Sequence, residues 1–183
     1  MSELWDFSLK VYPREGFQGA AIHLQDARGS DVNLLIYVLW LAATGRTALD
    51  PAGAAALTQT MAPVRATAIE PIRQLRRDLK GGIKDAPAEE VEELRKKLLG
   101  LELEAEQIEQ IMLISATTAP AAHEVKESGD LATAAAGLAA VAGLNSAPLA
   151  AEDRTALLAL LKAGCPDAGA DAAEAALDKA LSG

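Results

Sequence analysis

The chain contains few of the residues that stabilise small domains through covalent or metal cross-links. Its 183 residues include one cysteine, Cys165, and two histidines, His23 and His123. One thiol cannot form an internal disulfide, and these three side chains are too few for a structural zinc site. The sequence therefore excludes a disulfide scaffold and a zinc-stabilised domain, and the fold must depend on its hydrophobic core.

Strand patterns and long apolar runs are also missing. No sustained alternation of polar and β-branched residues occurs, which argues against a β-sheet. The most apolar stretch, residues 32–43, is shorter than the roughly 20 residues needed to cross a bilayer. The first residues are acidic, whereas a secretory signal opens with basic residues. We expect a cytoplasmic protein without a membrane span.

Catalytic motifs and surplus positive charge are absent as well. The chain has no glycine-rich phosphate loop, no Gly-x-Ser-x-Gly elbow and no His-Glu-x-x-His pair. Its formal net charge is −9, whereas binding to nucleic-acid phosphates needs surplus Lys and Arg. We name no catalytic residue, metal ligand or cofactor and expect no nucleic-acid partner, although enzymatic activity stays an open question.

Helix signals, by contrast, run along the whole chain. Apolar residues recur at helical spacing between capping residues and helix-ending glycines and prolines, so the sequence predicts an all-α protein. Pro71 predicts a kink or break near Glu70, because proline removes a backbone donor and clashes with the preceding turn. The expected helices cover residues 3–12, 14–28, 32–44, 61–80, 85–115, 130–142, 150–163 and 169–181.

Composition changes along the chain and indicates its organisation. We expect a compact helical bundle domain over residues 1–116, a linker over 117–129 and a small Ala-rich helical extension over 130–183. Alanine favours helix but buries little apolar area, so the extension should be marginal alone and should pack on another part of the protein.

Two central segments carry opposite charge and predict a long antiparallel helical hairpin. Residues 61–84 hold 6 basic and 2 acidic side chains, whereas 85–127 hold 4 basic and 11 acidic ones. Exposed pairs add little stability, so their main effect would be to fix orientation and register. Reversal around residues 81–87 would bring together Arg73, Arg76, Arg77 and Lys80 with Glu89, Glu90, Glu92 and Glu93.

The acidic segment also carries apolar residues that alternate by three and four positions, which is the heptad spacing of packed helices. This seam is either buried within the hairpin or shared with a second copy of the chain. The candidate interface residues are Val91, Leu94, Leu98, Leu101, Ile108 and Met112, with Ala105 between them.

Candidate ligand-binding residues gather at two places. Asp26, Asp31 and Asn33 surround a turn and could hold a cation or a polar ligand, although capping of the next helix is the more common use of such residues at the position of Asp31. Arg73, Arg76 and Arg77 form the second group. Arginine can bind phosphate through two parallel hydrogen bonds, or it can pair with a glutamate of the same chain.

Other polar residues have structural interpretations. Glu102, Glu106 and Glu109 share one helix face, which we expect to be solvated. His23 lies among apolar residues, where a lone histidine is usually hydrogen-bonded within the fold.

Several segments resemble a proteobacterial family of unknown function over about residues 2–115. The resemblance implies a small helical cytoplasmic protein and brings no activity, cofactor or catalytic residue. It excludes the tail from about residue 116. The segments that carry it are Leu4-Trp5-Asp6-Phe7-Ser8, Leu24-Gln25-Asp26, Gly29-Ser30-Asp31-Val32-Asn33-Leu34-Leu35, Leu39-Trp40-Leu41, Pro71-Ile72-Arg73-Gln74-Leu75-Arg76-Arg77 and Glu102-Leu103-Glu104-Ala105-Glu106-Gln107-Ile108-Glu109-Gln110.

These observations favour a non-catalytic interaction or assembly module that binds a protein partner or itself. The alternative is a small helical enzyme or ligand-binding protein, with the aspartates and Asn33 opposite the arginines around a phosphorylated or apolar-tailed small molecule. A membrane-surface or nucleic-acid adaptor is a weaker option, because the net charge opposes it.

Overall fold

The computed structural model of the protein describes residues 2–116 and 125–182. Every regular element in these two ranges is a helix, which confirms the all-α prediction. Among the described residues, no helix combines the length and apolar character needed to cross a membrane. The elements are α1 (Glu3–Val11), α2 (Phe17–Arg28), α3 (Val32–Ala43), α4 (Pro51–Val64), η1 (Arg65–Ile69), α5 (Glu70–Asp78), η2 (Leu79–Gly81), α6 (Ala88–Ala116), α7 (Leu131–Ala142), α8 (Ala151–Gly164) and α9 (Ala170–Leu181).

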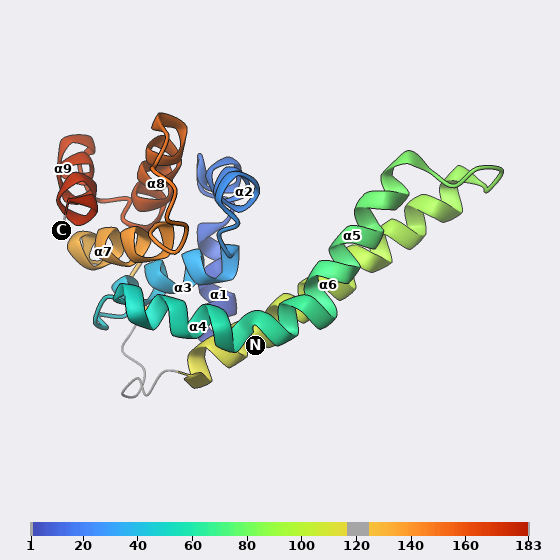
Figure 1. Cartoon of the computed structure of the whole chain (residues 1–183), viewed down its shortest axis with the longest axis horizontal. Coiled ribbons are helices and arrows are strands. Elements are labelled where there is room, and N and C mark those ends of the chain that lie inside the picture. The colour runs from blue at the N-terminus through green and yellow to red at the C-terminus, as the bar shows by residue number, and fades with distance from the viewer. Residues whose placement is uncertain (1, 117–124, 183) are drawn as a thin grey trace.

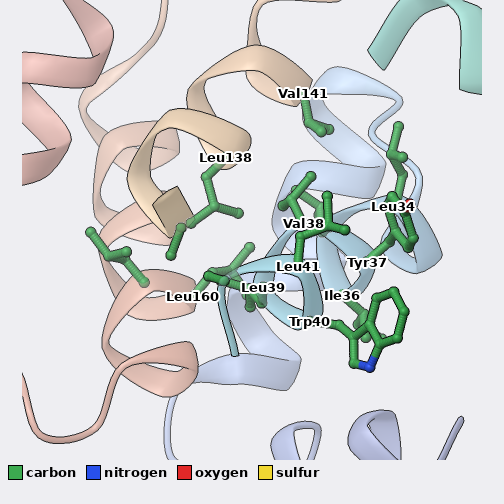
Figure 2. Close-up of a cluster of buried hydrophobic side chains, with 14 of the residues drawn as sticks. Leu34, Ile36, Tyr37, Val38, Leu39, Trp40, Leu41, Leu138, Val141 and Leu160 are labelled. Atoms are coloured by element: carbon green, nitrogen blue, oxygen red, sulfur yellow. The ribbon is translucent and has the colours of Figure 1, made fainter. Parts of the chain in front are cut away.

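Helix α3 forms the centre of the body. Every residue from Asn33 to Ala43 is buried, because this helix has no polar face to turn toward water. Its side chains meet those of α7 and α8 in one hydrophobic cluster (Figure 2). The helix begins at the Asp31 cap, whose Oδ1 accepts a hydrogen bond from the backbone N–H of Asn33 at 2.9 Å.

The Ala-rich tail packs on the N-terminal helices, as α7 lies against α3 and α8 against α2. Buried Arg28 adds a polar link, because its Nη2 donates to the carbonyl oxygens of Asn145 and Ala147, both at 2.9 Å. Asp153 also accepts from Arg28 Nη1 at 3.1 Å and lies 2.9 Å from His23 Nε2, which confirms a structural contact for that histidine. The tail therefore shares the core of the body.

The domain boundaries of the sequence interpretation stay a prediction. Most of the expected linker over 117–129 falls on residues 117–124, which lie outside the described residues. The described part of the expected extension, from 130 to 182, buries its apolar side chains against the N-terminal helices.

Helices α5 and α6 form an antiparallel hairpin that projects from the body (Figure 1). We call residues 70–101, from α5 through the turn to the first half of α6, the arm. The arm has a small hydrophobic cluster of its own, made by Leu79, Val91 and Leu98. Because this cluster is separate from the main core, the arm can present much of its surface to solvent.

The helix that leads into the arm starts earlier than the sequence predicted. It begins at Pro51 rather than near residue 61, after Asp50, whose Oδ1 accepts from the backbone N–H of Gly53 at 2.6 Å. The expected irregularity is the π-helix η1, which ends at Ile69, two residues before Pro71. A wider turn there accommodates a proline ring that would clash with the carbonyl four residues earlier in a regular α-helix.

Close packing of the tail on α3 depends on Gly137. A Cβ atom at this position would lie 2.7 Å from Cβ of Val38, so we expect Gly137→Ala to lower the free energy of unfolding by about 1–3 kcal/mol. Gly19→Ala in α2 is the matched control, because its added Cβ would meet nothing within 4 Å. Urea denaturation would measure both variants, and equal stability of the two would contradict this account of the α3–α7 contact.

Candidate functional site

A polar pocket of about 340 Å³ lies where the arm joins the body. The end of α2, the first residues of α3, η1, α5 and the second half of α6 supply its walls. Its polar lining is rich in charge of both signs. The carboxylates are Asp26, Asp31, Glu70, Glu106 and Glu109, and the guanidinium groups are Arg65, Arg73 and Arg77.

The fold brings together most of the ligand-binding candidates from the sequence. Asp26, Asp31, Asn33, Arg73 and Arg77 all line this pocket, and Arg76 does not. Asp31 caps α3 and also accepts a hydrogen bond from Nη1 of Arg65 at 3.3 Å. Ligand binding by these residues stays a prediction, because their internal contacts account for part of the arrangement.

The arginines of α5 pair with glutamates in the middle of α6. Arg73 donates through Nε to Glu102 at 2.8 Å and through Nη2 to Glu106 at 2.7 Å. Arg76 donates through Nε to the second oxygen of Glu102 at 2.6 Å. Although burial favours the protonated form, the hydrogen bonds from Arg76 and Arg73 hold the pKa of Glu102 below its ordinary value.

Two expectations about charge were therefore wrong. The partners of Arg73 and Arg76 are not the acids at 89–93, because α6 starts only at Ala88 and its first turns lie at the far end of the arm. The glutamate face is not solvated, since Glu102 is 4% and Glu109 is 1% exposed. The sequence did contain a signal for these pairs, namely the opposite net charge of the two segments.

The heptad seam divides into two neighbouring faces of α6. Val91, Leu98 and Ala105 are buried, whereas Leu94, Leu101 and Ile108 are 43%, 49% and 53% exposed. Met112 is partly buried. Nearer the body, the inner face of α6 also buries Glu102 and Glu109. These glutamates accept hydrogen bonds from Arg73 of α5 and from Asn33 at the start of α3. We call Leu94, Leu101 and Ile108 the outer stripe.

Glu109 is a buried glutamate of the pocket with one carboxyl oxygen that has no hydrogen-bond donor among the described residues. Its Oε2 accepts from the Asn33 side-chain amide at 2.6 Å, and Gln110 Nε2 fixes that amide by donating to its oxygen at 2.8 Å. Its buried Oε1 has no hydrogen-bond donor among the described residues. Burial and the nearby charge of Asp31 raise the pKa of Glu109 to about 8, against the opposing effects of Asn33 and Arg65. Burial and the neighbouring Asp31 therefore favour the protonated form of the Glu109 carboxyl group.

A family model described as a protein of unknown function (DUF2390) matches residues 3–113, which is more than half of the chain and includes the whole pocket. No curated protein and no solved structure matches the chain.

Glu109→Gln should change how stability depends on pH. The pKa of Glu109 rises from 4.5 to about 8 on folding, so the folded chain binds more protons than the unfolded chain within that interval. Stability then falls as pH rises through this window, by up to about 1.4 kcal/mol per pH unit from this group. The variant should lose that contribution and gain stability relative to wild type toward pH 8.

Urea denaturation at a series of pH values would measure this difference. Glu89→Gln, at an exposed position of the same helix, should retain the wild-type slope. A Glu109→Gln profile parallel to wild type from pH 5 to 8 would contradict the assignment of the proton to Glu109.

Proposed function

As a member of the DUF2390 family of unknown function, the chain inherits no established activity, and we propose that it works as a non-catalytic, cytoplasmic assembly module. Its partner is a second copy of the same chain. The two copies bind through the outer stripe of α6, arranged antiparallel about a two-fold axis. The resemblance noted in the sequence suggests a proteobacterial source for this module.

The exposure of the outer stripe is the observation that carries this proposal. Leu94, Leu101 and Ile108 lie seven residues apart on one helix, and each is at least 43% exposed. A row of exposed apolar side chains at heptad spacing along one helix is typical of a surface that another helix covers.

The residue pattern of the outer stripe favours binding to a second copy of the chain rather than to an unrelated partner. When two α6 helices run antiparallel about Leu101, this residue meets its own counterpart, and Leu94 faces Ile108 of the other helix. The same register places exposed Lys97 beside Glu104 of the second copy, twice per dimer. An interface with two-fold symmetry must be self-complementary in this way, and flanking opposite charges select the orientation.

Leu101→Lys should weaken self-association, because the two-fold axis would place two lysines side by side. We expect the dimer dissociation constant to rise by at least about tenfold in sedimentation equilibrium. Leu103→Lys is the matched control, since Leu103 is 40% exposed on another side of the same helix and should leave association unchanged. A wild-type chain that stays monomeric at high concentration, or equal weakening by both variants, would reject the proposal.

Charge reversal tests the register independently. Lys97→Glu and Glu104→Lys should each weaken the dimer, because each places like charges together across the interface. The double variant should restore association, since the opposite-charge pairs re-form with their signs exchanged. Failure of the double variant to recover would rule out this antiparallel register.

A further inference from the structure

The buried part of the arm–body junction is one positive charge short. Arg65, Arg73 and Arg76 supply three guanidinium groups, each with a side chain no more than 25% exposed. They face four acidic side chains at the same depth, which are Asp31, Glu102, Glu106 and Glu109. Charges held away from water need near-complete compensation, so this set requires one further positive charge or one bound proton.

The position that lacks compensation is Glu109, which lines the pocket. Arg73 and Arg76 both bind Glu102, and Arg73 also reaches Glu106. Arg65 lies 3.3 Å from Asp31, so Glu109 receives only the neutral amide of Asn33. Its second oxygen is buried and has no donor among the described residues, and Glu109 is part of the lining of this cavity.

The pocket chemistry argues against the phosphorylated ligand of the sequence interpretation. Five carboxylates line the pocket against three guanidinium groups, and the donors of Arg73 already bind Glu102, Glu106 and Gln25. An anion would find few free donors there. Among the described residues, no group of three or more His, Cys, Asp or Glu side chains is arranged to hold a metal ion.

We propose that this pocket binds a small aliphatic primary amine, whose ammonium group donates a hydrogen bond to the Glu109 carboxylate. An ammonium group supplies the missing single positive charge together with three hydrogen-bond donors. Val32 and Ile69 in the pocket wall offer apolar contact for a short carbon chain, and the cavity of about 340 Å³ limits the ligand to a small molecule.

Binding and protonation are linked at this site. The groups that face Glu109 are Asp31 and Asn33 from the start of α3, and Arg65 from η1. Arg73 from α5 is paired with Glu106 on the same wall, so Arg73 cannot supply the missing positive charge. When an alkylammonium ion binds, its charge stabilises the Glu109 carboxylate, and the proton of Glu109 leaves to solvent. Total charge is conserved, because one cation enters as one proton leaves.

Isothermal titration calorimetry of the full chain with butylammonium and with putrescine tests this proposal. Titrations at pH 7 in phosphate and in HEPES, which differ in ionisation enthalpy, report how many protons each binding event releases. We expect saturable binding with release of close to one proton per site at pH 7 and a smaller release at pH 9, above the raised pKa of Glu109. 1-Butanol, which has the chain without the charge, should not bind.

Glu109→Gln provides the decisive variant. We expect it to weaken amine binding by about tenfold or more and to abolish proton release, because it removes both the charge and the titrating proton. Glu89→Gln should bind as wild type does. Absence of saturable binding by wild type, binding without proton release at pH 7, or unchanged binding by a folded Glu109→Gln variant would each overturn the proposal. A Glu109→Gln variant that fails to fold leaves the proton count of wild type as the deciding result.

Discussion

A helix that is apolar on every side has to be enclosed, and α3 imposes that requirement on the whole chain. The body supplies walls from α1, α2, α7 and α8, so the tail is part of the same core. The start of α3 carries two polar residues, Asp31 and Asn33. That end therefore emerges at the arm–body junction, and enclosure of an apolar helix determines where a polar pocket can form.

One long helix, α6, packs against an apolar neighbour along the arm and against polar groups at the arm–body junction. Helix α6 runs from the far end of the arm to the floor of the pocket beside α3 (Figure 1). Along the arm its inner face is apolar at Val91 and Leu98, and nearer the body it becomes acidic at Glu102 and Glu109. Buried carboxylates are tolerated there because arginines and an amide meet most of them. The incomplete compensation of Glu109 sets this pocket apart from an ordinary structural ion-pair network.

Sequence patterns were most informative where local chemistry decides structure. Helix ends follow from capping and from glycine geometry, as at the Asp31 cap and at Gly29, whose φ of 68° suits a residue without a side chain. The start of this helix was placed too late, near residue 61, although Asp50-Pro51 suits a cap and first turn and Ala54, Leu57 and Met61 have helical spacing. The heptad spacing correctly indicated helix packing, but spacing alone does not say which of its two rows faces the neighbouring helix.

The sequence by itself determined the all-α class, most helix boundaries and the turn that makes the hairpin, because these depend on residues close together in the chain. Tertiary structure alone decided that Glu102 and Glu109 are buried and that Leu101 and Ile108 are exposed. It also brought Asp31, Arg65 and Glu109 into one pocket from three separate elements. Burial and pairing of charges depend on which helices meet and in what register, and no local pattern encodes that information.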